Sequence, residues 1–447
     1  MSFPRYPKYK PSGVEWLGEV PEHWALPKLK GVATFSGGGT PSRDNPAYWN
    51  GDIPWVSPKD MKAERIEGAE ESITEEGLRS SASNLLPPGR VLIVVRSGIL
   101  KHTIPIAINE TEVALNQDMK ALSFDRSKCV SRFFLRWVQG HNDQLLFAWA
   151  KQGATVESIE HSYLAQTVIP LPDIPEQTAI AEFLDRETGK IDGLVAEQRR
   201  LIELLKEKRQ AVISHAVTKG LNPHAPMKPS GIEWIGDVPE GWAFPKIKSI
   251  ATFSGGGTPS RDNPAYWNGD IPWVSPKDMK AEQIMGAEES ITDEGLKSSA
   301  SNLLPSGRVL IVVRSGILKH TIPIAINETA VALNQDMKAL SFDATKCDAR
   351  FFLRWVQGHN EQLLFAWSKQ GATVESIEHS YLAQTVIPLP DLPEQKAIVA
   401  FLDSELAKFD TLTAEAQRAI DFLQERRTAL ISAAVTGQID VRQPTRN

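Results

Sequence analysis

Two stretches of the chain, residues 175–220 and 393–438, carry apolar residues at alternating spacings of four and three. An average period of 3.5 residues is typical of the seam along which one helix of a coiled coil packs against another. In the first stretch the seam comprises Ile180, Leu184, Glu187, Ile191, Leu194, Gln198, Leu201, Leu205, Lys208 and Val212. In the second it comprises Ile398, Leu402, Phe409, Leu412, Ile420, Leu423 and Leu430. The pattern predicts two long helices that pair in antiparallel orientation.

The ends of the first stretch favour one continuous helix. Pro175 suits the first helical turn, where a missing N–H is harmless, and Glu176 favours the positive end of the helix dipole. Gly220 can end the helix. About 45 residues at 1.5 Å each make a rod of roughly 65 Å. The alternative, two ordinary core helices, is disfavoured by this length.

An internal repeat organises the rest of the chain. Residues 16–218 match residues 234–436 without a gap, each one 218 positions later. The helical parts differ most, as where Leu201 corresponds to Ala419. A repeat of this length indicates a duplicated globular domain with its helix rather than a solenoid. Three segments are identical in the two copies: 33–64 with 251–282, 89–111 with 307–329, and 151–173 with 369–391.

Each copy contains short apolar runs, which indicate strands, and one longer run of helical period. Residues 131–152 form the helical run, with a break near Gly140. Each copy is therefore predicted to be a mixed α/β domain, and the duplication predicts pseudo-two-fold symmetry. The predicted strands are 91–95, 104–108, 112–115 and 167–169. The predicted parts are a first domain (1–172), a first spacer helix (173–220), a second domain (221–390), a second spacer helix (391–440) and a tail (441–447).

Composition and charge place this chain among ordinary globular proteins. Of its 447 residues, 41% are hydrophobic and 23% are charged. The net charge of −6 disfavours nucleic-acid binding by the protein as a whole, so any DNA contact must come from local patches. Cys129 and Cys347 offer no disulfide framework, which fits a reducing cytoplasm. The apolar runs are too short to cross a membrane, so we expect a cytoplasmic protein without membrane contact.

A loop rich in glycine, serine and proline, residues 36–62, is the most distinctive candidate for a binding surface. Its glycines let the backbone approach a ligand closely, and its hydroxyl and cationic side chains can donate to phosphates or base edges. It matches neither a Walker loop nor GxGxxG. The alternative is a surface turn with buried aromatic residues. The DNA-contact candidates are Ser36, Gly37, Gly38, Thr40, Ser42, Arg43, Lys59 and Lys62, and in the second copy Ser254, Gly255, Gly256, Thr258, Ser260, Arg261, Lys277 and Lys280.

Two further basic segments are candidates for DNA contact. RSGILKHT, residues 96–103, directly follows a predicted strand, and KQGAT, residues 151–155, follows a helix. Both could hold backbone phosphates, and the alternative for each is a solvated turn. Their candidate residues are Arg96, Lys101, His102 and Lys151, with Arg314, Lys319, His320 and Lys369 in the second copy.

Catalytic and metal-binding signatures are missing from the sequence. Residues 45–48, NPAY, resemble the tetrapeptide of amino-methyltransferases, but Ala47 stands where those enzymes have a second proline. No glycine-rich cofactor loop follows a strand with an acidic residue at the expected distance. The histidines are scattered, and no His/Cys pair has metal-ligand spacing. We therefore expect no catalytic residues, no metal and no cofactor in this chain.

The chain resembles the specificity subunit of type I restriction–modification systems. Each domain is followed by IPLPDIPEQTAI or IPLPDLPEQKAI and by a helix that ends in KRQAVISHAVT or RRTALISAAVT. The loop GTPS…YWNGDIPWVSPKDM is similar to that family too, so the resemblance covers nearly the whole chain. One departure is that the two domains are nearly identical, whereas in many relatives they differ.

This resemblance implies a non-catalytic chain that reads double-stranded DNA through two target recognition domains. Two methyltransferase (M) subunits would dock on the helices and hold S-adenosylmethionine, and restriction/translocase (R) subunits would join for cleavage. Two rival interpretations stay open: the chain is itself the methyltransferase, or it is a scaffold that does not touch DNA. Apolar residues left over from the seam would form the partner surface: Phe183, Ile202, Leu204, Phe401, Ile420 and Phe422.

The identical loops also predict the symmetry of the target. Equal loops should read equal half-sites, and an antiparallel helix pair would place those half-sites as inverted repeats. With half-site centres about 10 base pairs apart and half-sites of the family's usual three or four bases, the gap would be about six or seven. The predicted rod is longer than this separation, so either the domains overhang their helix ends inward or the gap is longer. The copies differ outside the candidate loops, so we expect these differences to leave specificity unchanged: Arg65/Gln283, Glu67/Met285 and Arg126/Ala344.

Overall fold

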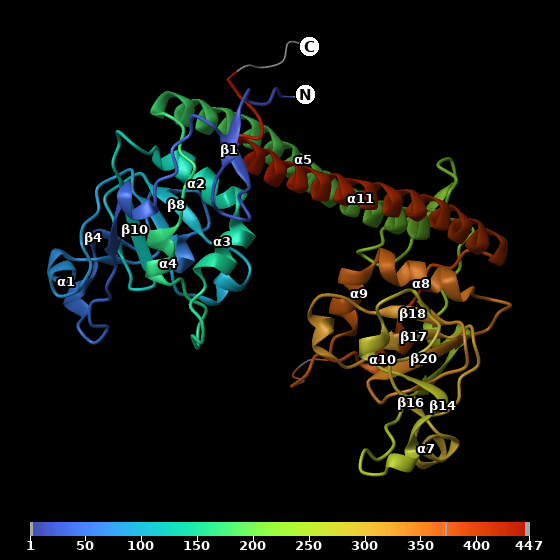
Figure 1. Ribbon diagram of the computed structural model, residues 1–447. Coiled ribbons are helices and arrows are strands. Elements are labelled where there is room, and N and C mark those ends of the chain that lie inside the picture. The colour runs from blue at the N-terminus through green and yellow to red at the C-terminus, as the bar shows by residue number, and fades with distance from the viewer. Residues whose placement is uncertain (1–2, 370, 372, 443–447) are drawn as a thin grey trace. The chain divides into compact units, whose positions relative to one another are not determined.

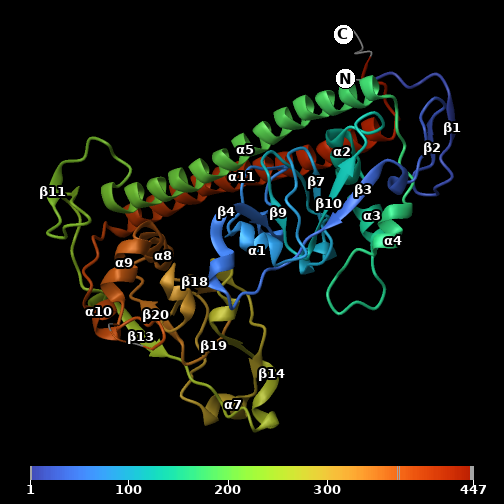
Figure 2. The ribbon, with the colours of Figure 1, turned by 90° about the vertical axis from the view of Figure 1, so that its left-hand side faces the viewer.

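The computed structural model of the protein describes residues 3–369, 371 and 373–442 (Figures 1 and 2). The chain forms two compact units, each containing one α/β domain and part of both long helices. One unit comprises Met1–Arg199 with Arg418–Asn447, and the other comprises Arg200–Gln417. The predicted tail, residues 441–447, lies outside the described residues from position 443 onward.

A five-stranded sheet forms the centre of the first unit, with strand order β3-β10-β7-β8-β5. Its pairs are antiparallel except for β5 and β8, which run parallel. All four residues of the central strand β7 are buried, which explains its unbroken apolar sequence VLIV. The bounds are β3 Ala33–Gly37, β5 Arg65–Ile66, β7 Val91–Val94, β8 Ile106–Asn109 and β10 Met119–Phe124.

Two smaller sheets complete the β-structure of the first unit. A three-stranded sheet has the order β6-β4-β9, and a hairpin of β1 and β2 precedes the domain. Strands β4 and β9 pair in parallel, which places the end of β4 beside the start of the turn after β9. The bounds are β1 Tyr9–Pro11, β2 Glu19–Pro21, β4 Trp49–Val56, β6 Ser72–Ile73 and β9 Ala114–Leu115.

The helices of the first domain are short, and α2 contributes most to its core. Phe133, Phe134 and Trp137 of this helix are fully buried in the cluster that contains the central strands. The α-helices are α1 Glu75–Arg79, α2 Ser131–Gly140, α3 Asn142–Trp149 and α4 His161–Gln166. The 3₁₀-helices are η1 Leu29–Gly31, η2 Pro46–Tyr48, η3 Pro58–Asp60 and η4 Gly98–Lys101.

The second unit repeats this architecture, with sheets ordered β13-β20-β17-β18-β15, β16-β14-β19 and β11-β12. Its strands are β11 Met227–Pro229, β12 Asp237–Pro239, β13 Ala251–Gly255, β14 Trp267–Val274, β15 Gln283–Ile284, β16 Ser290–Ile291, β17 Val309–Val312, β18 Ile324–Asn327, β19 Ala332–Leu333 and β20 Met337–Phe342. Its helices are α6 Ile247–Ile250, η5 Pro264–Tyr266, η6 Pro276–Asp278, α7 Asp293–Ser298, η7 Gly316–Lys319, α8 Ala349–Gly358, α9 Asn360–Trp367 and α10 His379–Gln384.

The predicted fold class, two mixed α/β domains with long helices, is confirmed. The strands predicted at 91–95, 104–108 and 112–115 are present with shifted ends, and the helical run at 131–152 breaks after Gly140 as predicted. The strand predicted at 167–169 is wrong. Val168 forms only an isolated bridge to Lys28, because the segment meets a single extended residue of the preceding chain rather than a strand.

The two long helices, α5 (Ile174–Lys219) and α11 (Leu392–Val435), pack together along their length (Figures 1 and 2). In the first unit, Nε of Arg427 on α11 donates to Asp192 on α5 at 2.9 Å. In the second unit, Arg209 on α5 pairs with Asp410 on α11. The partner positions fall along one helix as they rise along the other, so the predicted antiparallel pairing is confirmed.

The middle of the seam on α5 lies one residue later than predicted. Val195 is buried and Ile202 is half-buried, whereas Leu194 and Leu201 are exposed. Leu412 on α11, another predicted seam residue, is exposed as well. On α5, Leu194 is followed by Val195 and Leu201 by Ile202, so a seven-residue apolar pattern fits either member of each pair. The helix also rotates by roughly 20° per heptad relative to an ideal 3.5-residue repeat, so the pattern alone could not choose.

The predicted partner surface needs a correction. Three of its six residues are buried or half-buried by packing within the protein. Phe183 is only 5% exposed, since the first turns of α5 pack on the first domain and its ring meets Phe3 edge-on at 5.1 Å. Ile420 is 4% exposed, and Ile202 is half-buried in the seam. The remaining three are exposed as predicted: Leu204, Phe401 and Phe422.

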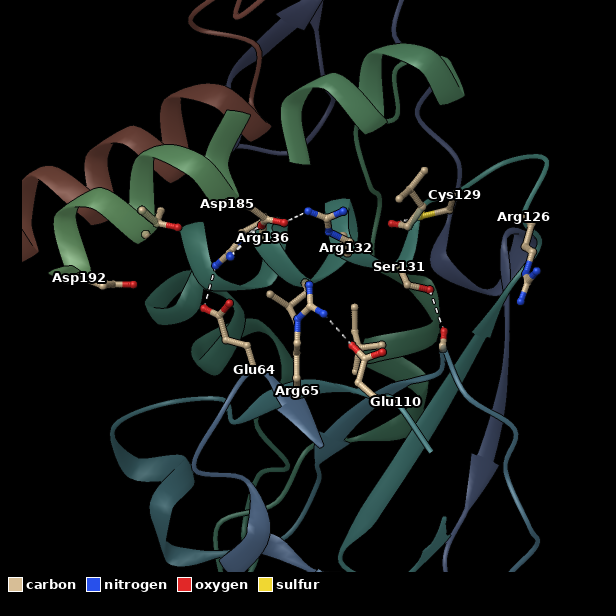
Figure 3. Close-up of a pocket in the computed structure, with 16 residues that line it drawn as sticks. Glu64, Arg65, Glu110, Arg126, Cys129, Ser131, Arg132, Arg136, Asp185 and Asp192 are labelled. Carbon is tan, nitrogen blue, oxygen red and sulfur yellow. Dashed lines mark hydrogen bonds and ion pairs between the residues drawn. The ribbon is translucent and has the colours of Figure 1, made fainter. Parts of the chain in front are cut away.

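A buried arginine joins the first domain to α5. The side chain of Arg136, on α2, is 7% exposed. Its Nη1 donates to Glu64 at 2.7 Å, and its Nη2 donates to Asp185 of α5 at 2.9 Å (Figure 3). Arg427 of α11 also donates to Glu64, at 3.2 Å. Burial alone would raise the pKa of Glu64, but the charges of Arg136 and Arg427 outweigh it and lower that pKa.

The second unit contains the same ionic junction at the equivalent positions. Arg354 donates to Glu282 at 2.7 Å and to Asp403 of α11 at 3.0 Å. Arg209 of α5 lies 3.9 Å from Glu282. Each domain is therefore joined to its helix by a buried guanidinium with two carboxylate partners, and the opposite helix supplies a second arginine. A more exposed arginine of each domain, Arg132 or Arg350, pairs with the same helix carboxylate.

We predict that Arg136→Ala lowers the free energy of unfolding of the first unit by about 2–3 kcal/mol. The substitution would remove the buried cation between Glu64 and Asp185 and keep only Arg427 and Arg132 as their ionic partners. The partial exposure of the two carboxylates keeps the loss below that of a fully buried pair. Native-state hydrogen exchange of α2 would measure it. The matched control is Arg79→Ala, whose ion pair with Glu75 is fully exposed and should contribute less than about 0.5 kcal/mol. Equal effects of the two substitutions would contradict the assignment.

Candidate nucleic-acid interface

Three segments of the first unit meet at one end of the large sheet. They are the glycine run that leaves β3, the turn between β9 and β10, and the segment that follows β7. The glycine run needs its glycines there, because a Cβ on Gly38 would lie 1.9 Å from the carbonyl oxygen of Asn116. A Cβ on Gly39 would lie 2.7 Å from the backbone nitrogen of Ala82. Close backbone packing, rather than ligand approach alone, therefore explains two of the three glycines.

A chain of polar side chains runs across this sheet end. Thr40 donates to the amide oxygen of Gln117, and Nε of Arg96 donates to Asp118 at 2.5 Å. The loop of residues 150–158 lies beside them, because Arg96 and Ser158 form a backbone bridge. We call the exposed side chains of Thr40, Arg96 and Gln117, with the partly exposed Asp118, the sheet-end site.

The predicted cations of the 36–62 loop lie elsewhere, around the small sheet. Arg43 stacks over the ring of Trp49, 3.9 Å from its centroid, and forms a two-point ion pair with Glu71. This pairing raises the pKa of Arg43 and lowers the pKa of Glu71. Lys62 pairs with Glu70 at 2.8 Å. The cations are exposed but neutralised by neighbours, which fits the negative net charge of the protein.

The structure thus separates the predicted DNA-contact residues into three groups. Ser36, Gly37, Gly38, Thr40, Arg96 and Lys151 lie at the sheet end, with Ser254, Gly255, Gly256, Thr258, Arg314 and Lys369 in the second unit. Around the small sheet lie Ser42, Arg43, Lys59 and Lys62, with Ser260, Arg261, Lys277 and Lys280. Lys101 and His102, with Lys319 and His320, lie at a 3₁₀-helix, η4 in the first unit and η7 in the second.

Sequence reasoning missed Gln117 and Asp118 of the sheet-end site. Their signal was present in the sequence ALNQDMKAL, where three polar residues interrupt two apolar runs. Asn and Asp favour tight turns because their side chains bond to nearby backbone. Here Oδ1 of Asn116 accepts from the backbone N–H of Asp118 at 2.8 Å. The segment was not singled out because it carries no cluster of positive charge.

The differences between the copies at Arg65 and Arg126 lie away from the sheet-end site. Arg65 and Arg126 line a cavity of about 800 Å³ beside α2 and α5, next to the ionic junction (Figure 3). Arg65 pairs there with Glu110 at 3.2 Å. In the second unit, Gln283 and Met285 line the corresponding cavity. These differences thus lie near the helices, while Thr40, Arg96, Gln117 and Asp118 have identical counterparts in the second copy.

A family model described as "Type I restriction modification DNA specificity domain" matches residues 21–203 and 239–420. The chain belongs to this family. It is a type I restriction–modification specificity subunit, the non-catalytic part of such complexes, with two target recognition domains. The family, the fold class and the non-catalytic role predicted from sequence are confirmed.

Curated relatives carry the same description. The specificity subunit is 33% identical over 251 residues to the EcoR124I/EcoR124II specificity subunit of Escherichia coli, which covers 55% of each chain. It therefore spans about half the length of that relative. It is 22% identical to the MjaIX specificity subunit of Methanocaldococcus jannaschii, over 96% of each chain.

Two solved structures share the fold of the specificity subunit. A chain from a study of complex assembly and conformational transition in the type I R-M system matches with a TM-score of 0.73 and 16% identity, over 94% of this chain and 99% of that chain. The HsdS subunit from Thermoanaerobacter tengcongensis matches with a TM-score of 0.55 and 16% identity, over 94% and 98%.

Within residues 3–369, 371 and 373–442, no group of three His, Cys, Asp or Glu side chains could hold a metal ion. Within the same residues, no helix has the length and apolar character that crossing a membrane requires.

The glycine run offers a prediction with an internal control. Gly38→Ala should destabilise the first unit by about 1–3 kcal/mol, because the new methyl group overlaps the backbone of Asn116. Gly37→Ala should change stability by less than about 0.5 kcal/mol, since nothing lies within 4 Å of its Cβ position. Thermal unfolding of both variants would measure the difference. Equal stability would show that the loop does not pack on the β9–β10 turn.

Proposed function

We propose that this specificity subunit binds double-stranded DNA at a bipartite target and directs two methyltransferase subunits to it. The observation that carries the proposal is the presence of the same sheet-end site on identical segments of both units. In this proposal residues 1–172 and 221–390 are the target recognition domains. The methyltransferase subunits hold S-adenosylmethionine, restriction/translocase subunits join where the system cleaves, and the complex works in the cytoplasm.

The charge distribution favours recognition of DNA through its base edges rather than through non-specific attraction to its phosphates. The protein has a net charge of −6, and Arg43, Lys62 and Arg96 each have a carboxylate partner. Phosphate contacts from unpaired cations dominate non-specific binding. Hydrogen-bonding side chains at a rigid sheet end instead suit the donor and acceptor pattern of the major groove. We infer that specificity arises at the sheet ends and that Lys101, His102 and Lys151 contact phosphates.

The target is proposed to be an interrupted palindrome. Equal sheet-end sites, such as Thr40–Gln117 and Thr258–Gln335, should read equal half-sites. An antiparallel pair of equivalent helices has a two-fold axis across it, and a two-fold protein reads inverted repeats when this axis lies on the DNA dyad. The ion pairs support this symmetry, since the repeat positions of Asp192–Arg427 recur as Asp410–Arg209.

Single-molecule sequencing of methylated DNA would test the proposed function. Cells that express the specificity subunit with its methyltransferase should carry methylation at two inverted half-sites, and deletion of the specificity subunit should abolish it. Two unrelated half-sites, or a direct repeat, would contradict the palindrome alone. Methylation that persists without the specificity subunit would contradict its role in DNA recognition and would favour the scaffold.

The exposed apolar residues of the helices are the proposed docking surface for the methyltransferase subunits. Leu204 and Phe422 occupy equivalent repeat positions and are 44% and 64% exposed. Leu194 and Leu412 form a second equivalent pair, also exposed. Each unit therefore presents at least one exposed apolar side chain from each helix, as a partner present in two copies would require.

The double variant Leu204→Lys/Phe422→Lys should bind the methyltransferase subunit at least 10-fold more weakly, because charge would replace desolvated apolar contact. Isothermal titration with the purified methyltransferase subunit would measure the affinity, and circular dichroism would verify that helicity is kept. The control is Glu197→Lys, an exposed polar position of α5. Unchanged affinity with unchanged helicity would exclude this surface.

A further inference from the structure

The turn between β9 and β10 holds one exposed glutamine on a rigid base. Gln117 is exposed, while Leu115 before it and Met119 after it are fully buried. The N–H of Asn116 donates to the carbonyl of Val56 at 3.0 Å, and the carbonyl of Asp118 accepts from Val95 at 2.8 Å. Both neighbours of the glutamine are thus bonded to separate strands. A side chain held this way is preorganised for recognition.

The amide of Gln117 has a defined orientation. Its oxygen accepts from the hydroxyl of Thr40, and its nitrogen donates to the carboxylate of Asp118 at 3.5 Å. An amide has two acceptor lone pairs and two N–H donors. Among the residues that the structure describes, these contacts use one of each. One acceptor and one donor therefore stay available, side by side, for a ligand.

This remaining pattern matches a single base. In the major groove, adenine presents a donor at N6 beside an acceptor at N7, and a glutamine amide can satisfy both together. Guanine presents two acceptors there, which suit an arginine instead. On this basis, and given the proposed DNA binding, we propose that Gln117 and Gln335 determine specificity by each reading one adenine of its half-site.

Gln117 is better placed to bind a base than Arg96 or Arg43, because both arginines are paired with carboxylates. Nε of Arg96 donates to Asp118. Near the small sheet, Arg43 pairs with Glu71 and stacks on Trp49. In the second unit, Thr258 donates to Gln335 in the same way, and Arg314 donates to Asp336 at 2.6 Å. In both units, then, a threonine hydroxyl donates to the amide oxygen of the glutamine, and the aspartate that follows it binds an arginine.

The experiment selects targets for the full-length chain from a random duplex library and then measures competition between single-base variants. Gln117→Ala should reduce discrimination in favour of adenine at one position of one half-site by roughly 5- to 150-fold. Gln335→Ala should do the same in the other half-site, and the double variant in both. Gln144→Ala, an exposed glutamine on α3, is the matched control and should leave the selected sequence unchanged.

Two further variants separate base reading from structural damage. Gln117→Glu keeps the shape of the side chain but lacks the donor for N7, so its preference should move from adenine to cytosine, whose N4 donates. Thr40→Val removes the bond that orients the amide and should weaken discrimination, while Thr40→Ser should restore it. A position that keeps its adenine preference in Gln117→Ala, or an equal loss of affinity on all sequences, would overturn the assignment. A wild-type chain without any selected sequence would instead overturn the proposed function.

Discussion

The buried guanidinium of Arg136, with its counterpart Arg354, is the interaction on which the placement of each domain on its helix depends. Each group joins a carboxylate before the edge strand of the sheet to a carboxylate on a long helix. A charge with such low exposure is stable only while both partners are in place. The junction therefore fixes the rotation of the helix against the domain, which apolar packing alone leaves degenerate.

The duplication repeats this ionic junction in both units. Each unit receives its second arginine from the helix that belongs to the other copy, as Arg427 does at Glu64 and Arg209 does at Glu282. The same repeat position, Arg209 in the first copy and Arg427 in the second, thus supplies the second arginine of both junctions. Three of the positions that differ between the copies, Arg65, Arg126 and Met285, line the cavities beside the helices. The sheet ends are identical, which preserves one recognition chemistry on two domains.

Local compensation of charge fits the proposal that an acidic protein reads DNA mainly through base contacts. Three cations of the candidate segments, Arg43, Lys62 and Arg96, are paired with Glu71, Glu70 and Asp118. Weak general attraction to DNA favours discrimination, because affinity then depends on groups that distinguish bases. A neutral amide on a fixed turn fits that requirement better than a mobile lysine.

By itself, the sequence determined the architecture. Its 218-residue repeat, its strand-length apolar runs and its heptads were enough for two α/β domains, two antiparallel helices and the family. These signals are periodic and local, so they survive without knowledge of contacts. Tertiary structure decided what periodicity cannot: whether Leu194 or Val195 faces the seam, and that Phe183 is covered by Phe3.

The candidate site likewise combines features that the sequence predicts with features that only the tertiary structure shows. Residue type alone picked out the glycine run and Arg43, but only folding shows that Gly38 packs on Asn116 and that Arg43 is bound by Glu71. Gln117 carries no charge and no motif, and the polar interruption in which it stands does not by itself mark a binding residue. Its importance arises because three segments distant in sequence meet at one sheet end. The residues that a chain exposes there are set by strand register and loop packing, which depend on contacts between distant positions.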